Sequence, residues 1–117
     1  MATQIAYTVA VLFIETPYFT RFCEAHCSDD ALRRLQQTLI ERPETGDLIR
    51  GTKGLRKMRW ALAGRGKSGG ARVIYYWRTV AGRIYLLHAY AKSEQSDLTD
   101  AQRKMLVQWI NEVLGHE

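Results

Sequence analysis

Basic side chains recur at close spacing in the middle of the chain, where they could bind a phosphate. Lys57 and Arg59 stand two apart in the segment 55–62 (LRKMRWAL), so in a strand both side chains point to one face. Their neighbours Met58 and Trp60 then point to the other face, which we expect to be the packed one. A charged face backed by a packed face is a common way for a sheet to present cations to phosphate.

A glycine-rich basic loop and another arginine follow directly. Residues 63–70 (AGRGKSGG) combine Arg65 and Lys67 with glycines, whose backbone can approach a phosphate closely. Arg72 stands at the head of the next expected strand, 71–77. The loop is not a P-loop, because a strand follows it where a P-loop requires a helix.

Two further candidates stand at the end of the last expected strand, 83–90. Tyr90 and Lys92 leave this strand on the same face, and a phenol or an ammonium can take part in proton transfer. Arg78 and Arg83 flank the turn at the other end of the hairpin. We expect that second pair to be solvated and not catalytic.

The charge distribution indicates a polyanionic partner. The chain of 117 residues has 17 Lys and Arg against 12 Asp and Glu, a net charge of +5. No Asp or Glu stands between Leu48 and Ser93, whereas both flanks are net acidic. The cations of this stretch are Arg50, Lys53, Arg56, Lys57, Arg59, Arg65, Lys67, Arg72, Arg78, Arg83 and Lys92. They repel one another unless a polyanion shares the surface, and the alternative is a solvated basic face.

Length and composition fit one soluble globular domain, 1–117. The longest apolar run, 6–14, is too short to span a bilayer and lacks the basic start of a signal peptide. Without a secretory signal, we expect Cys23 and Cys27 to be reduced thiols. We therefore expect a cytoplasmic protein with no membrane contact, no metal and no other cofactor.

Strand and helix signals predict an α+β fold. We expect strands at 7–14, 55–62, 71–77 and 83–90, and helices at 17–25, 29–41 and about 98–114. Thr16 before Pro17 is the expected start of the first helix, and Ser28, Asp29 and Asp30 are the expected caps of the second. Leu48 and Ile49, in the loop between, should dock on the core. Hairpin spacing of the later strands predicts a twisted antiparallel sheet of about four strands with helices packed on it.

The region from Gly51 to Leu98 resembles the RelE/HigB toxin family, in particular its HigB-like branch. The residues that carry the resemblance are GTKGLRKMRWA, GRGKSGGARVIYYW and IYLLHAYAKSEQSDLT. The specific part is the glycine-basic loop that runs into GGARVIYY, with LRKMR before it and YAKSE after it. The resemblance implies a single toxin domain with a RelE-like microbial ribonuclease fold. The family pattern has glycine where Lys53 stands, a difference that we expect to change little.

The resemblance implies a ribosome-dependent mRNA endoribonuclease that inhibits translation without a metal ion. In such enzymes the ribose 2′-hydroxyl attacks the adjacent phosphate and expels the 5′-oxygen of the next nucleotide. The step needs a base, cations for the charge on the phosphorane, and an acid, whereas this region of the chain offers no acidic residue. The implied partners are mRNA in the ribosomal A site, the ribosome with its rRNA, and a cognate antitoxin, expected to be a helix-turn-helix DNA-binding protein.

Matching the motifs assigns the chemistry to basic positions. Lys57 and Arg59 match the family's basic strand pair. Arg72 matches its arginine at the head of the next strand, and Lys92 its basic position after the last strand. We expect catalytic roles for these four residues and for Tyr90, with Tyr90 or Lys92 as candidates for proton transfer. The residues expected to bind RNA or the ribosome are Arg50, Lys53, Arg56, Arg65 and Lys67.

The chain departs from the pattern of the RelE branch at two positions. The RelE branch has a second basic residue where this chain has Ser93, and a tyrosine where it has Thr99.

A non-catalytic RNA- or DNA-binding module, or an inactive toxin homologue, is the main alternative to the ribonuclease. The RRM motif is missing, and the last helix carries only Arg103 and Lys104, too few for reading a groove. A plain oligomerisation domain leaves the acid-free basic stretch unexplained.

Overall fold

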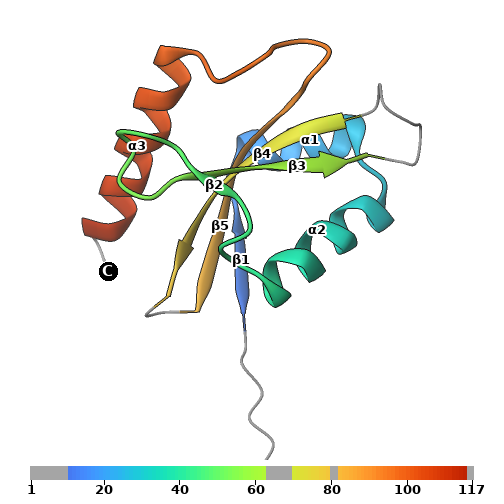
Figure 1. Cartoon of the computed structure of the whole chain (residues 1–117), viewed down its shortest axis with the longest axis horizontal. Coiled ribbons are helices and arrows are strands. Elements are labelled where there is room, and N and C mark those ends of the chain that lie inside the picture. Colours follow the sequence, from blue (N-terminus) through green and yellow to red (C-terminus); the bar gives the residue numbers. More distant parts are fainter. Residues whose placement is uncertain (1–10, 63–69, 80–81, 116–117) are drawn as a thin grey trace, which may run out of the picture.

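The chain folds as a sheet with helices on both of its faces (Figure 1). The computed structural model describes residues 11–62, 70–79 and 82–115. Within these ranges the strands are β1 (Leu12–Glu15), β2 (Asp47–Leu48), β3 (Arg56–Ala61), β4 (Gly70–Arg78) and β5 (Arg83–Ala91). The helices are α1 (Pro17–His26), α2 (Asp29–Glu41) and α3 (Asp100–Gly115). The expected α+β class, with helices packed on a sheet, is confirmed.

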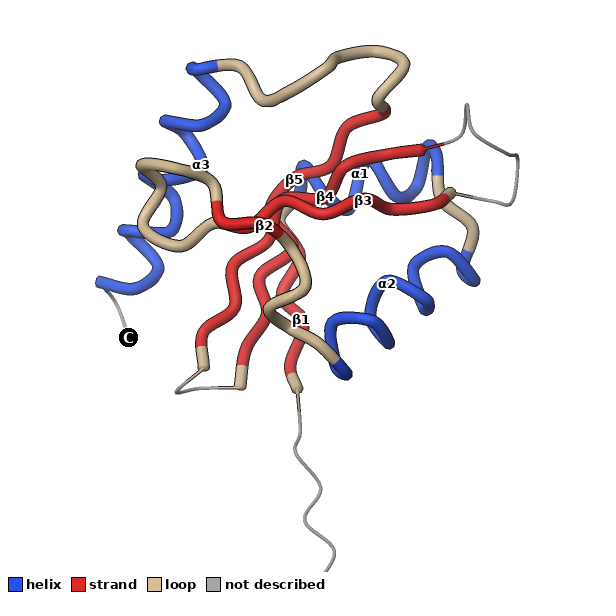
Figure 2. The backbone as a smooth tube through the Cα atoms, in the orientation of Figure 1, coloured by secondary structure: helices blue, strands red, loops and turns tan. Residues whose placement is uncertain are grey.

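The five strands form one mixed sheet in the order β1-β5-β4-β3-β2 (Figure 2). β3, β4 and β5 pair antiparallel in consecutive order, as the hairpin spacing predicts. The expectation of an all-antiparallel sheet of about four strands is corrected at the two edges. β1 runs parallel to β5, and the short β2 pairs antiparallel with β3. Residues 7–10 of the expected first strand lie outside the described ranges.

Side-chain caps begin the first two helices where the sequence predicts them. Thr16 Oγ1 accepts a hydrogen bond from the Phe19 N–H at 3.2 Å, and Ser28 Oγ accepts one from the Ala31 N–H at 3.1 Å. Each bond satisfies a helix N–H that has no partner within the helix. Thr16 Oγ1 also donates to the Leu87 carbonyl at 2.6 Å, which ties the start of α1 to β5.

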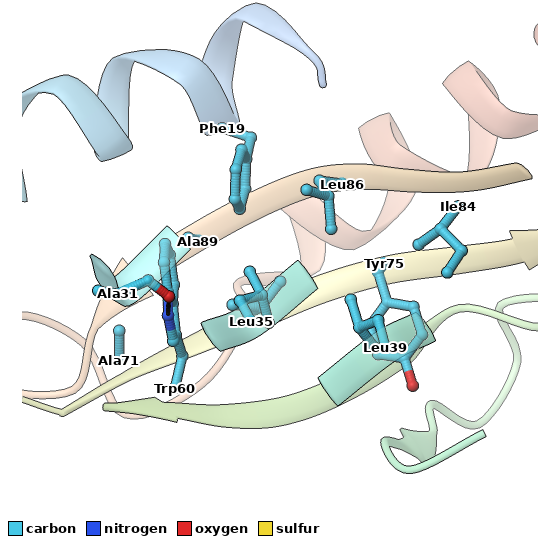
Figure 3. Close-up of a cluster of buried hydrophobic side chains, with 11 residues drawn as sticks. Phe19, Ala31, Leu35, Leu39, Trp60, Ala71, Tyr75, Ile84, Leu86 and Ala89 are labelled. Carbon is cyan, nitrogen blue, oxygen red and sulfur yellow. Dashed lines mark hydrogen bonds between the residues drawn. The ribbon is translucent and has the colours of Figure 1, made fainter. Parts of the chain in front are cut away.

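Two buried clusters hold the helices to the sheet. The α1–α2 face carries Phe19, Leu35, Leu39, Trp60, Val73, Tyr75, Ile84 and Leu86, with smaller side chains between them (Figure 3). The α3 face carries Leu55, Ile74, Tyr85, Leu87, Tyr90, Leu98, Leu106 and Ile110. Neighbouring side chains along a strand point to opposite faces, so each strand of the hairpin contributes to both clusters.

The two core contacts expected before β3 have different outcomes. Ile49 packs against the α3-face cluster, as predicted. Leu48 is 63% exposed, so its predicted docking on the core is wrong. It belongs to β2, a two-residue strand at the edge of the sheet that pairs with β3 alone.

The segment that leads into β2 is held by side chains from β3 and β4. The Tyr75 hydroxyl donates to the Pro43 carbonyl at 2.7 Å and accepts from the Gly46 N–H at 2.8 Å. The Arg56 guanidinium donates to the Gly46 carbonyl at 2.7 Å. A Cβ at Gly46 would lie 2.8 Å from the Tyr75 ring, so this close approach requires glycine. The segment is therefore fixed against β3, with Thr45 beside the basic face.

A β-bulge in the hairpin decides which face Tyr90 occupies. The register shifts between Ile74 and Tyr75 of β4, which leaves Leu87 of β5 as the extra residue. Leu87 and Tyr90 lie in the same α3-face cluster although they are three residues apart. A bulge shifts the two-residue alternation by one position. It therefore turns Tyr90 to the face that carries Arg72, its direct partner on β4.

Replacing Lys53 with glycine should stabilise the protein by about 0.5–1 kcal/mol. Lys53 has a φ of 61°, a left-handed conformation that is costly for a residue with a Cβ and easy for glycine. The greater freedom of glycine in the unfolded chain offsets part of the gain. Urea denaturation measures the change in unfolding free energy. Lys53→Ala removes the same charge but keeps the Cβ, and an equal gain in both variants would contradict the argument.

Candidate active site

Strand register brings basic side chains of β3 and β4 into one row. Arg59 lies directly opposite Arg72, and Arg72 lies directly opposite Tyr90 on β5. Opposite residues of an antiparallel pair share a face of the sheet. Two arginines in direct opposition repel each other and cost stability. The pair therefore favours an anion-binding role for this face.

An open cleft of about 630 Å³ lies over this row. It is lined by Thr45, Asp47, Lys57, Met58, Arg59, Arg72, Lys92 and Ser96. Four of the five expected catalytic residues therefore surround one space, although they come from β3, from β4 and from the end of β5. The Lys92 N–H donates to the Gly70 carbonyl at 3.1 Å, which fixes the backbone from which the lysine side chain extends.

Most cations of the cleft have no carboxylate partner among the described residues. The exception is Lys57, whose Nζ donates to Asp97 Oδ1 at 3.0 Å. Arg59, Arg72 and Lys92 make no ion pair in the part of the chain that the structure describes. The Arg72 guanidinium has one long contact, 3.4 Å to the carbonyl of the residue before it. Its planar fork is open to a phosphate, which it can bind through two oxygens.

Tyr90, the fifth expected catalytic residue, lies beneath the cleft and not on its wall. Its side chain is 4% exposed and belongs to the α3-face cluster. Burial raises the pKa of its hydroxyl, the charge of Asp97 adds to this, and Arg72 acts in the opposite direction. The hydroxyl is therefore protonated near neutral pH and can donate a proton but not accept one. Its oxygen is buried without a well-directed hydrogen bond to the described residues.

Two carboxylates lie at the cleft, which corrects the expectation that this region offers no acid. Asp47 lines the cleft because β2 places it directly opposite Lys57. Asp97 reaches Lys57 from the segment between β5 and α3. The hydrogen bond from Lys57 is the main cause of a lowered pKa of Asp97, so this carboxylate is charged at neutral pH. Both aspartates stand just outside the acid-free stretch and join the site only through tertiary pairing.

None of the described residues that are expected to bind RNA lines the cleft. Arg50 and Lys53 are exposed on the connection between β2 and β3, outside the cleft lining. Arg56 is half-buried and donates to backbone carbonyls of the segment before β2, on the face opposite Lys57. These contacts give Arg56 a structural role, and its expected contact with RNA stays a prediction. Arg65 and Lys67 of the glycine-rich loop lie outside the described residues.

The structure shows the surroundings of Thr99 and Ser93, the two positions at which the chain departs from the RelE-branch pattern. Thr99 Oγ1 accepts from the Gln102 N–H at 3.1 Å, and Gln102 Oε1 accepts from the Thr99 N–H at 3.0 Å. This reciprocal pair is a capping box that begins α3. Ser93 is exposed after β5. The capping box fixes the segment that enters α3, and this segment carries Asp97.

Other site chemistries have little support in residues 11–62, 70–79 and 82–115. There, no three His, Cys, Asp or Glu side chains gather in a way that could hold a metal ion. Cys23 and Cys27 are free and half-buried, and burial raises the pKa of both thiols, which disfavours the nucleophilic thiolate. No helix in this part of the chain is long and apolar enough to cross a membrane.

Comparison with known proteins gives the family. The model of the RelE toxin of the RelE/RelB toxin–antitoxin system matches residues 13–116. The chain belongs to the RelE toxin family. Among solved structures, a mutant of the E. coli toxin RelE in the free state matches with a TM-score of 0.52 and 14% sequence identity. The match covers 74% of this chain and 88% of that chain, and it confirms the expected RelE-like fold.

Family membership identifies the chain as a RelE toxin of a toxin–antitoxin system, as the resemblance implies. The cleft over Arg59 and Arg72 is the candidate active site of this toxin. The HigB-like branch, the catalytic roles of the cleft residues and the nature of the antitoxin stay predictions.

Proposed function

We propose that this RelE toxin is an endoribonuclease of the HigB-like branch that cuts mRNA in the ribosomal A site and so inhibits translation. The observation that carries the proposal is the cleft in which Lys57, Arg59, Arg72 and Lys92 meet. Three of these cations have no ion pair among the described residues. A phosphodiester that gains a second negative charge as it reacts is the ligand that such a set stabilises best.

The proposed reaction is attack by the ribose 2′-oxygen on the adjacent phosphorus. The bond from phosphorus to O2′ forms, the bond to the 5′-oxygen of the next nucleotide breaks, and a 2′,3′-cyclic phosphate and a free 5′-hydroxyl result. One proton leaves the 2′-hydroxyl and one reaches the departing 5′-oxygen. The phosphorane carries more negative charge than the phosphate before it, so cations that contact it accelerate the reaction.

The cleft residues fit different parts of this reaction. Arg59 and Arg72 stand opposite each other on neighbouring strands and suit the non-bridging oxygens of one phosphate. Lys57 and Lys92 add point charges from two sides of the set. For proton transfer we propose Lys92, which is exposed at the cleft, or Tyr90, whose raised pKa restricts it to the role of donor. The four cations supply the charge that a metal ion supplies elsewhere, so the proposed step is metal-independent.

The ribosome is the proposed anionic scaffold for the basic surface outside the cleft. Arg50 and Lys53 flank Gly51, which lines a hollow together with Arg103 and Lys104 of α3. We propose that these cations contact rRNA while the cleft receives the message. The remaining partner is the cognate antitoxin, proposed to be a helix-turn-helix DNA-binding protein. With these partners, the proposed location of the toxin is the cytoplasm.

Purified toxin should cleave message on translating ribosomes, and expression of the toxin alone should arrest growth. Co-expression of the antitoxin gene should restore growth. Fragments should end in a 2′,3′-cyclic phosphate or its hydrolysed form, as read by primer extension and end-group analysis. Because ribosomes themselves need Mg²⁺, metal independence is tested with toxin stripped by EDTA beforehand and with a phosphorothioate at the scissile position. A thiophilic metal should not rescue the phosphorothioate message.

Several outcomes would change the proposal. Binding that falls steeply with salt, without any cleavage, would favour the alternative of a non-catalytic RNA-binding module or an inactive toxin homologue. Equal cleavage of free and ribosome-bound message would retain the ribonuclease and remove its dependence on the ribosome. Rescue of the phosphorothioate message by Mn²⁺ or Cd²⁺ would contradict a metal-independent reaction.

A further inference from the structure

Asp97 holds the Lys57 ammonium at the edge of the cleft. Asp97 Oδ1 accepts a hydrogen bond from Lys57 Nζ at 3.0 Å and another from the Leu98 N–H at 2.8 Å. Asp97 does not itself line the cleft, whereas its neighbour Ser96 and its partner Lys57 do. The carboxylate therefore acts on the site through the lysine that it contacts.

The segment that carries Asp97 is fixed by its own hydrogen bonds. Gln95 Nε2 donates to the Asp97 carbonyl at 2.8 Å and to Gln102 Oε1 at 3.0 Å. The capping box between Thr99 and Gln102 continues this network into α3. Leu98 is 8% exposed and packs in the α3-face cluster. These contacts hold the backbone that carries the Asp97 carboxylate in one position. The carboxylate can therefore serve as a fixed partner for Lys57.

Neither stability nor RNA affinity explains this ion pair. The side chains of Lys57 and Asp97 are 32% and 57% exposed, and an ion pair so open to water adds little to stability. A negative charge beside an anion-binding cleft lowers the affinity for RNA by repulsion. The hydrogen bond from Lys57 is the main cause of the lowered pKa of Asp97, so this carboxylate is charged at neutral pH and attracts the ammonium. A gain in reaction rate is the benefit that remains.

We infer that Asp97 is a positioning residue for RNA cleavage, an inference that rests on the proposed ribonuclease function. A free lysine side chain has many rotamers, and Asp97 restricts them before the RNA binds. An ammonium has three N–H donors, so Lys57 keeps two for phosphate oxygens while one contacts Asp97. A cation fixed in advance stabilises the phosphorane without reorganisation during the reaction.

Asp97→Asn should separate cleavage rate from affinity. Asparagine keeps the size of the side chain and an acceptor for the Leu98 N–H, but it loses the charge that holds Lys57. Single-turnover cleavage on ribosomes saturated with toxin should slow about 10-fold to 100-fold. Ribosome affinity should be equal to or higher than that of the wild type, and the melting temperature should be unchanged. Asp97→Glu, which keeps a carboxylate, should recover part of the rate.

A matched control removes the same charge from the neighbouring turn. Asp100 is exposed in the first turn of α3 and is not part of the cleft lining, so Asp100→Asn should cleave at the wild-type rate. If the wild type cleaves and Asp97→Asn cleaves equally fast or faster, the positioning role alone is overturned. Parallel loss of rate, affinity and melting temperature in Asp97→Asn would show a structural residue, which also overturns the inference. A wild-type toxin that does not cleave overturns the proposed function and this inference with it.

Discussion

Replacement of Arg72 with alanine should reduce message cleavage by about a hundredfold to a thousandfold, while most ribosome binding remains. Arg72 lies at the centre of the row on the cleft floor, between Arg59 on β3 and Tyr90 on β5. Its guanidinium makes no ion pair with a described residue, so it is available to a phosphate. An arginine that contacts the charge of the phosphorane more strongly than that of the ground state affects rate more than affinity.

The melting temperature of Arg72→Ala distinguishes a catalytic arginine from a structural one. Arg59 faces Arg72 directly, so truncation removes a repulsion between like charges and breaks no ion pair among the described residues. We therefore expect the melting temperature to stay the same or to rise slightly. A strong fall would show that the arginine supports the sheet, and the loss of cleavage would then say nothing about chemistry.

Two further variants control for charge. Arg72→Lys keeps the positive charge but loses the planar fork, so its cleavage rate should lie between those of the wild type and Arg72→Ala. Arg34→Ala removes an exposed arginine from α2, on the other side of the sheet, and should cleave at the wild-type rate. The measurement is cleavage of ribosome-bound message at saturating toxin. Equal rates for Arg72→Ala and the wild type would remove Arg72 from the reaction.

The basic face of the site could be predicted from local periodicity. Lys57 and Arg59 share a face because alternate residues of any strand do so, and Trp60 is buried on the other face for the same reason. Hairpin spacing then brings Arg72 beside them. Arg56 belongs to the same run of cations but alternates to the face of Trp60, where it binds backbone carbonyls. Composition alone does not distinguish Arg56 from Lys57 and Arg59. Strand alternation does, because it places Arg56 on the opposite face of the sheet.

The acidic part of the site depends on contacts that no local pattern contains. Asp97 meets Lys57 across 40 positions of sequence, after the chain has completed β4 and β5 and turned toward α3. Asp47 reaches the cleft through β2, which has two residues and no recognisable alternation. The burial of Tyr90 requires both the bulge at Leu87 and the packing of α3. Each of these features is decided by tertiary pairing.

The same distinction applies to the fold. The starts of α1 and α2 were predicted because Thr16 and Ser28 satisfy helix N–H groups only three residues ahead. The parallel pairing of β1 with β5 was not predicted, because Leu12 and Arg83 meet across most of the chain. Nothing in a β-branched run near the start of a sequence specifies which later strand it joins, or in which direction.

Replacement of Trp60 with alanine should lower the unfolding free energy by about 3–5 kcal/mol. Trp60 is 4% exposed and stacks on Phe19, with ring centroids 5.7 Å apart (Figure 3). Its indole N–H donates to the Ala31 carbonyl at 2.9 Å. One side chain of β3 therefore contacts both α1 and α2. Its loss leaves a cavity and removes the hydrogen bond to the Ala31 carbonyl, a large effect for a domain whose total stability is about 5–15 kcal/mol.

Trp60→Phe isolates the packing contribution from the hydrogen bond. Phenylalanine keeps a ring against Phe19 but has no donor for the Ala31 carbonyl, so we expect a smaller loss of about 1–3 kcal/mol. Urea denaturation followed by circular dichroism measures both variants. Arg59 precedes Trp60 and points to the cleft, so the packing of Trp60 fixes the strand that presents this cation. A loss below about 1 kcal/mol in Trp60→Ala would contradict the view that the packed face holds the basic face in place.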